Sequence, residues 1–203
     1  MYLVKTPQLV QKLFPKFTWR IPTTEKVIYL TFDDGPIPEI TPWVMQQLNL
    51  HDAKATFFCV GENVVRYPNI FQALLAEGHQ VGNHTQQHLD AWKTSTSRYL
   101  NNVAQCAKSV ASPLFRPPYG HLTPSQAKAL QKQYRIILWD VLSGDFDPSI
   151  SKEQCWQNIQ QHTTAGSIVV LHDSWKAAEK LRYVLPKTLA FFSKQGYIFR
   201  ALS

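Results

Sequence analysis

The alternation of strand-like and helix-like segments is the feature of this sequence that most limits its fold. Short runs rich in β-branched and aromatic residues, including 27–30, 55–61, 135–140 and 167–171, are predicted strands, and they are followed by longer segments with the apolar spacing of helices. The pattern recurs about seven times, which is typical of a parallel sheet covered by helices. This many units favours a closed or nearly closed β/α barrel over an open sheet.

The length and composition indicate one domain. At 203 residues and 44% hydrophobic, the chain can bury the core of a single α/β domain. We expect residues 1–203 to form that domain, with residues 1–26 as an N-terminal extension packed on it. Lysines and prolines interrupt the apolar residues of the extension, so it resembles neither a signal peptide nor a membrane span. We therefore expect no integral membrane segment and a cytoplasmic location.

The charged residues and cysteines exclude several other classes of protein. The net charge is +7, but the lysines are scattered and form no stripe that would follow a nucleic acid backbone. Cys59, Cys106 and Cys155 are odd in number and far apart, which argues against a disulfide scaffold or a zinc knuckle. We expect a monomer or weak oligomer that does not bind nucleic acid.

Two adjacent carboxylates, Asp33 and Asp34, follow the predicted strand 27–30 and precede Gly35-Pro36. Ligands of α/β proteins bind at the carboxyl ends of parallel strands, so this position suggests chemistry. The alternative is a plain turn, because Asp-Gly is a common turn dipeptide. The residues at the other strand ends favour a catalytic role over a plain turn, because they supply the partners that two carboxylates need.

A histidine pair follows the third predicted strand, residues 80–82. His84 and His88 are four residues apart, so on one helical turn they would share a face and bind the same ion. With one carboxylate they form a site of two histidines and one acid with open positions for water and substrate. The alternative is a pair of surface histidines at the start of a helix.

Later strand ends supply further candidates. Arg116 begins a rigid Arg-Pro-Pro-Tyr-Gly segment, where it is placed to keep an Asp ionised, and an exposed backbone N–H near Tyr119 is suited to an oxyanion. His172 ends another strand, and Asp145 is a candidate partner that would raise its pKa and favour acid catalysis. Considered alone, the Arg-Pro-Pro-Tyr-Gly segment would be interpreted as a loop, and His172 as a core histidine.

Five stretches in this order resemble the polysaccharide deacetylases, the NodB-homology carbohydrate esterases of family 4. They are 31–35, 84–88, 116–120, Trp139 with Asp145, and 171–173, and the resemblance extends from about residue 27 to the C-terminus. It implies a distorted (β/α) barrel and a metal-dependent hydrolase that removes N-acetyl groups from N-acetylated glycans, such as peptidoglycan- or chitin-like N-acetylglucosamine polymers.

The resemblance also implies a role for each matching residue. Asp33 would be the general base, His172 the general acid, and Asp34, His84 and His88 the metal ligands. Residues that act on these groups or on the substrate would be Arg116 (orienting Asp33), Asp145 (tuning His172), Tyr119 (oxyanion binding), and Trp139 and Leu171 (lining the acetyl pocket). Zinc suits the ligand set, and cobalt, nickel or manganese are alternatives.

One motif departs from the family. Where the family usually has Asp-x-x-Asp-Trp, this chain has Leu142 and Phe146 in place of the first Asp and the Trp, which alters the pocket wall. An O-acetyl glycan esterase or a small-molecule amidase with the same site is therefore an alternative. From a different class, a non-catalytic glycan-binding protein on the same fold is a further alternative, although it would not need His172 beside Asp145.

Overall fold

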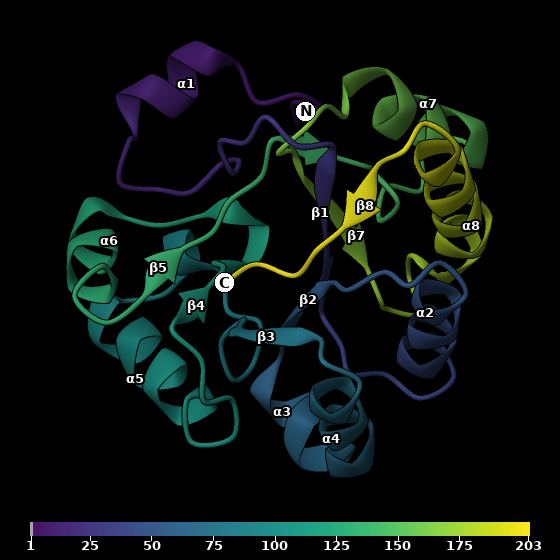
Figure 1. Cartoon of the computed structure of the whole chain (residues 1–203). Helices are drawn as coiled ribbons and strands as arrows, with labels where there is room; N and C mark the ends of the chain where they lie inside the picture. The colour runs from purple at the N-terminus through teal and green to yellow at the C-terminus, as the bar shows by residue number, and fades with distance from the viewer. Residues whose placement is uncertain (1) are drawn as a thin grey trace.

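A curled parallel sheet lies at the centre of the computed structural model, which describes residues 2–203 (Figure 1). The strand order is β5-β4-β3-β2-β1-β7-β6, β8 pairs with β1, and every pairing between these strands is parallel. The strands are β1 (Val27–Asp33), β2 (Thr56–Cys59), β3 (Gln80–Asn83), β4 (Leu114–Phe115), β5 (Arg135–Ile136), β6 (Val141–Leu142), β7 (Ile168–His172) and β8 (Ile198–Phe199).

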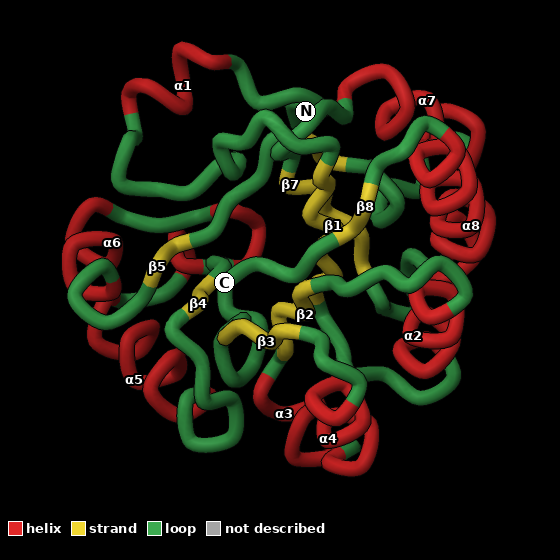
Figure 2. Tube along the Cα trace, viewed as in Figure 1, coloured by secondary structure: helices red, strands yellow, loops and turns green. Residues whose placement is uncertain are grey.

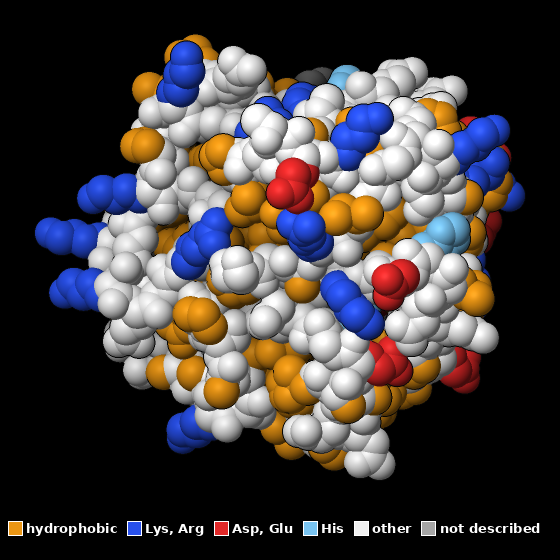
Figure 3. All heavy atoms as spheres, viewed as in Figure 1, with side chains coloured by type: hydrophobic (Ala, Val, Ile, Leu, Met, Phe, Trp, Pro, Cys, Tyr) orange, Lys and Arg blue, Asp and Glu red, His pale blue; other side chains and the backbone are white. Residues whose placement is uncertain are grey.

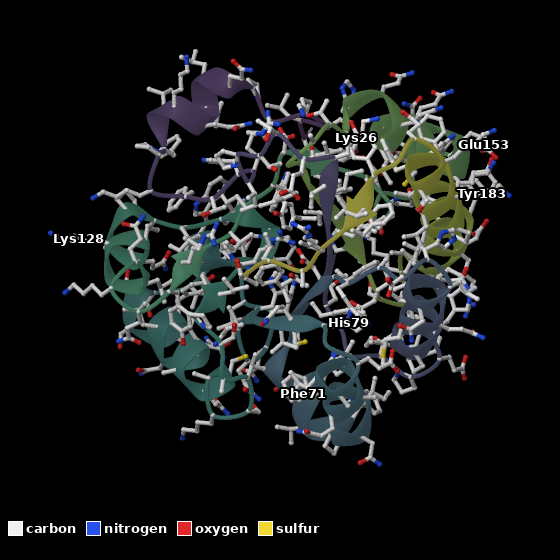
Figure 4. All side chains as sticks on the ribbon, viewed as in Figure 1. Lys26, Phe71, His79, Lys128, Glu153 and Tyr183 are labelled. Atoms are coloured by element: carbon white, nitrogen blue, oxygen red, sulfur yellow. The ribbon has the colours of Figure 1, made fainter. Side chains whose placement is uncertain are left out.

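Helices surround the sheet on its outside (Figure 2). Their apolar faces pack against the strands: Phe71 of the fourth helix is buried, whereas Lys128 of the sixth extends into solvent (Figure 4). The helices are α1 (Gln8–Leu13), α2 (Ile40–Asn49), α3 (Gly61–Arg66), α4 (Pro68–Ala76), α5 (Thr96–Cys106), α6 (Pro124–Leu130), α7 (Lys152–His162) and α8 (Ala178–Lys194), with short 3-10 turns at Ala91–Lys93 and Pro118–Gly120.

The distorted barrel predicted from the sequence is confirmed, with one strand placed wrongly. The expected strand 135–140 is not continuous: β5 ends at Ile136, and β6 begins at Val141 on the opposite edge of the sheet. The chain therefore crosses the open seam of the barrel between these two short strands. The strand β5 pairs with β4, whereas β6 pairs with β7 at the other edge of the sheet. Residues 135–140 therefore cannot form one continuous strand.

The N-terminal segment lies along this seam. Thr18 bridges Ile137, and its N–H donates to the carbonyl of Ile136 at 2.9 Å. Nearer the N-terminus, Lys5 bridges Val141, and its Nζ contacts the buried carboxylate of Asp140 at 2.6 Å. These contacts satisfy backbone groups of the edge strands that would otherwise lack partners.

The surface has the scattered charge expected from the sequence. In the face seen from the side of β8, lysine and arginine side chains lie apart from one another and form no continuous stripe (Figure 3). All three cysteines are buried and free. Within residues 2–203, no helix has the length and apolar character needed to cross a bilayer.

Candidate active site

The register of the parallel sheet brings the predicted site residues to one mouth. Asp33 at the end of β1 pairs with His172 at the end of β7. On the other side of β1, Asn83 at the end of β3 pairs with Phe115 of β4, so the next residues, His84 and Arg116, emerge together. Parallel strands align their ends, so we expected these residues to converge, and the structure places them at the same mouth.

Asp34, His84 and His88 form a cluster whose ligand atoms all lie within 4.8 Å of one another. The Asp34 Oδ1 atom is 3.2 Å from His88 Nε2 and 3.8 Å from His84 Nε2. Asp34 has a φ of 86°, which turns its side chain away from the line of β1 and separates it from Asp33. The two adjacent carboxylates therefore have different surroundings.

The histidine pair does not lie on a helical turn, so that prediction was wrong. Residues 84–88 form a loop in which Thr85 and His88 have φ values of 65° and 52°. Two asparagine side chains hold the loop: Asn83 Oδ1 accepts from the Thr85 N–H at 2.9 Å, and Asn102 Oδ1 from the Gln86 N–H at 2.9 Å. Sequence reasoning missed Asn83 and Asn102, because neither stands in a pattern that predicts loop support.

The donor atoms of this cluster fit a metal ion. Asp34 Oδ1 is buried and receives no hydrogen bond from residues 2–203, so a cation would supply its missing partner. His84 Nδ1 lies 2.7 Å from the Arg116 carbonyl, to which it donates, and this leaves the Nε2 lone pair for the ion.

The charge environment also suits these ligand roles. Burial lowers the pKa of His84 to about 4, so the ring is neutral. Burial alone would raise the pKa of Asp34, but the adjoining imidazoles of His88, His172 and His84 hold it below its usual range.

Arg116 is completely buried and fixes Asp33. Its Nη1 donates to Asp33 Oδ1 and to Thr31 Oγ1, both at 2.7 Å. The Nη2 atom donates to the Leu138 carbonyl at 3.1 Å, and the guanidinium lies 4.1 Å from the centre of the Phe58 ring. Burial lowers the pKa of Arg116, and the charge of Asp33 opposes this. Arg116 contacts only one oxygen of Asp33, so it orients the carboxylate and still leaves it accessible from the cavity.

His172 and Asp145 form the second buried pair. His172 Nδ1 donates to Asp145 Oδ1, and the His172 backbone N–H donates to Asp145 Oδ2, both at 2.7 Å. Burial lowers the pKa of His172, but the charge and hydrogen bond of Asp145 outweigh this and raise it to about 9. The ring therefore carries a proton at neutral pH, with Nε2–H free to donate.

A cavity of about 410 Å³ joins these groups; it is lined by Asp33, Asp34, both cluster histidines, His172 and the side chains around them. Trp139 lies in its wall, as predicted. Tyr119 has a φ of 61°, and no oxygen of residues 2–203 accepts a hydrogen bond from its backbone N–H. Phe146, one of the two residues that depart from the family motif, packs edge-on to His172 at 5.1 Å between ring centres. It also packs against Tyr2, at 5.2 Å between ring centres.

The prediction that Leu171 lines this cavity was wrong. Leu171 is fully buried in the apolar core cluster, whereas Val170 and His172 line the cavity. Successive side chains of a strand point to opposite faces, so residues on either side of Leu171 share the face of the catalytic mouth. Val170 therefore takes the wall position that the sequence analysis gave to Leu171.

Asp173 is a buried acid to which the sequence analysis assigned no role. Its carboxylate accepts hydrogen bonds from the Gly35 N–H at 3.0 Å and from the hydroxyl of Thr41. Burial raises the pKa of Asp173 to about 8, although both hydrogen bonds oppose the shift. These contacts anchor the turn that follows Asp33 and Asp34.

Together, the barrel and its mouth define a hydrolase class: an acid–histidine cluster suited to a metal ion, flanked by a carboxylate fixed by arginine and a histidine that carries a proton. The family model for polysaccharide deacetylases matches residues 20–136. This chain belongs to the polysaccharide deacetylase family, whose deacetylases are metal-dependent.

Individual relatives agree with this assignment. The chain is 36% identical, over 92% of its length, to a peptidoglycan-N-acetylglucosamine deacetylase of Bacillus cereus, and the match covers 91% of that protein. It is 35% identical over 87% of its length to the peptidoglycan-N-acetylglucosamine deacetylase PgdA of Listeria monocytogenes, but spans only 38% of it. The crystal structure of a peptidoglycan N-acetylglucosamine deacetylase superposes with a TM-score of 0.87 at 29% identity, covering 97% of this chain and 95% of that one.

Proposed function

We propose that this protein is a metal-dependent deacetylase that hydrolyses the N-acetyl groups of N-acetylglucosamine glycans related to peptidoglycan or chitin. The observation that carries the proposal is the pairing of two unlike proton-transfer groups across one cavity. Asp33 is oriented by Arg116, and His172 is protonated through Asp145, with the Asp34 cluster lining the same cavity. The names of the relatives described above support the glycan substrate.

The metal ion would be held by Asp34, His84 and His88. When bound, it would activate water and polarise the acetyl carbonyl, which an amide needs because it resists attack. Two imidazoles and one carboxylate suit zinc, and cobalt, nickel and manganese accept the same ligands. All three residues belong to one chain, which supports a monomer or weak oligomer as the active form.

Asp33 is the proposed general base. Its carboxylate lines the cavity next to Asp34, and Arg116 fixes the direction of its Oδ1 atom. A base must lie within hydrogen-bond reach of the proton that it removes, and a buried guanidinium, which stays charged and accepts no proton itself, holds Asp33 in place. Asp33 would thus take a proton from the attacking water.

Tyr119 and His172 would complete the reaction. The free backbone N–H of Tyr119 is directed by a rigid turn and would donate to the oxyanion that forms on the acetyl carbonyl. His172 would then donate its Nε2 proton to the departing amine, since an amine anion is a poor leaving group. The same His172 is less necessary for an ester, whose alkoxide leaves more readily.

The deciding experiment measures acetate release from N-acetylglucosamine oligomers by zinc- or cobalt-loaded protein, with the chelated form and Asp33→Asn beside it. We expect release that needs both the metal and Asp33, while Asp33→Asn still binds one ion. Release from an O-acetylated xylan oligomer but from no N-acetyl substrate would favour the esterase. Binding of oligomers without release from either would favour the glycan-binding protein.

A further inference from the structure

Trp92 is an exposed side chain that the structure nevertheless holds in a fixed position. It is 65% exposed and lies in the turn Ala91–Lys93. Its backbone N–H donates to Asp90 Oδ1 at 3.0 Å, and its indole Nε1 donates to the Leu122 carbonyl at 3.3 Å. A large apolar ring that is both solvent-facing and anchored at two points suggests a binding surface.

His121 stacks on one face of this indole. The ring centres are 3.5 Å apart and the planes differ by 7°. Asp90 aligns both rings, because the Oδ1 atom that accepts from the Trp92 N–H also lies 3.0 Å from His121 Nδ1. A single imidazole covers only one face of an indole, so with 65% of Trp92 accessible its other face is open to solvent.

The stack is continuous with the catalytic cavity. His121 lines that cavity together with Asp34 and His172. A row of rings leads outward from the metal cluster: His88 to Tyr119 at 4.8 Å, Tyr119 to His121 at 5.8 Å, and then His121 to Trp92. A polymer with one unit at the cluster would therefore pass along these rings if it left the mouth on this side.

We propose that Trp92, aligned by Asp90 and His121, is a stacking platform for a pyranose ring of the bound glycan other than the ring being deacetylated. A β-linked N-acetylglucosamine ring has a flat face of C–H bonds, which packs on the electron-rich face of an indole, while its hydroxyl groups stay at the rim. The inference rests on the proposed function for the identity of the glycan. With such a platform, the enzyme would favour oligomers over short fragments.

The test compares binding of N-acetylglucosamine pentamer and dimer by titration calorimetry, in the Asp33→Asn background so that hydrolysis does not obscure the titration. We expect Trp92→Ala to weaken pentamer binding by about 2- to 10-fold and to weaken dimer binding less. Trp92→Phe keeps an aromatic face and should recover most of the pentamer affinity. Phe14→Ala, which removes another exposed aromatic ring on the N-terminal segment, is the control and should change neither affinity.

Equal pentamer affinity with and without Trp92 would overturn the platform, as would equal losses for both lengths or no pentamer binding at all. The proposed function is tested separately by acetate release from the enzyme with Asp33 intact. Release together with Trp92-independent binding would reject the platform and keep the deacetylase. Trp92-dependent binding without release from any oligomer would reject the deacetylase and keep the platform.

Discussion

Replacing Asp145 with Asn should move the alkaline limit of activity, because Asp145 is what keeps His172 protonated. Asp145 raises the pKa of His172 from 6.5 to about 9 against the effect of burial. A general acid works only while protonated, so activity of the unmodified protein should fall as pH rises through about 9. In the variant, Asn accepts one hydrogen bond but directs its NH₂ group at the other donor, the His172 backbone N–H.

The size of the effect follows from these pKa values. If the pKa of His172 in the variant returns to about 6.5, roughly one-thirtieth of the ring is protonated at pH 8, against about nine-tenths with a pKa near 9. The initial rate of acetate release should therefore drop about 30-fold at pH 8 but less than about 2-fold at pH 6 through this effect. The half-buried Asp147, which makes no hydrogen bond to His172, is the control, and Asp147→Asn should leave the profile unmoved. A loss of the same factor at both pH values would refute the reasoning.

The same pair predicts a pH dependence of stability that requires no metal. A histidine whose folded pKa is raised stabilises the protein fully below its unfolded pKa of 6.5 and loses this contribution as pH rises through about 9. The contribution is on the order of 3 kcal/mol. The destabilisation caused by Asp145→Asn, measured by urea unfolding, should be larger at pH 6 than at pH 10 by about this amount; an equal loss at both would contradict it.

Three further predictions test other parts of the site. His84→Ala should abolish metal binding measured by calorimetry, whereas His51→Ala, remote from the cavity, should not; a full metal content in His84→Ala would reject the ligand. Arg116→Met leaves Asp33 buried without its partner and should cost about 3–5 kcal/mol in chemical denaturation, and a loss below about 1 kcal/mol would argue against the pair. Val170→Ala should admit longer acyl groups, while Leu171→Ala should lower stability by about 2–5 kcal/mol with unchanged acyl preference; the reverse outcome would restore Leu171 to the wall.

The sequence predicted those features that depend on element order and failed where they depend on local backbone geometry. Asp33, Arg116 and His172 could be assigned to one mouth because parallel strands align their ends. Spacing alone suggested a helical turn for His84 and His88, and it could not reveal that Thr85 adopts a positive φ, since that conformation is sustained by Asn83 and by a distant helix.

Two other differences have equally local causes. The run 135–140 looks like one strand, but the chain leaves β5 for the opposite edge, and its four apolar residues, 136–139, have no property that indicates a seam. Leu171 and Val170 are both strand residues, and their faces follow from the strict alternation that places His172 at the mouth. Counting back two residues from His172 would have identified Val170.

The seam segment has a consequence for the order in which the chain folds. Lys5 contacts Asp140 and Thr18 contacts Ile137 across more than a hundred residues, so this N-terminal segment can dock only after those later residues are in place. Contacts of such large sequence separation slow folding because loop closure precedes the stabilisation that they bring. The edges of β5 and β6 stay unpaired during that interval. We therefore expect the barrel to close late in folding, and until then these unpaired edges are surfaces at which chains can aggregate.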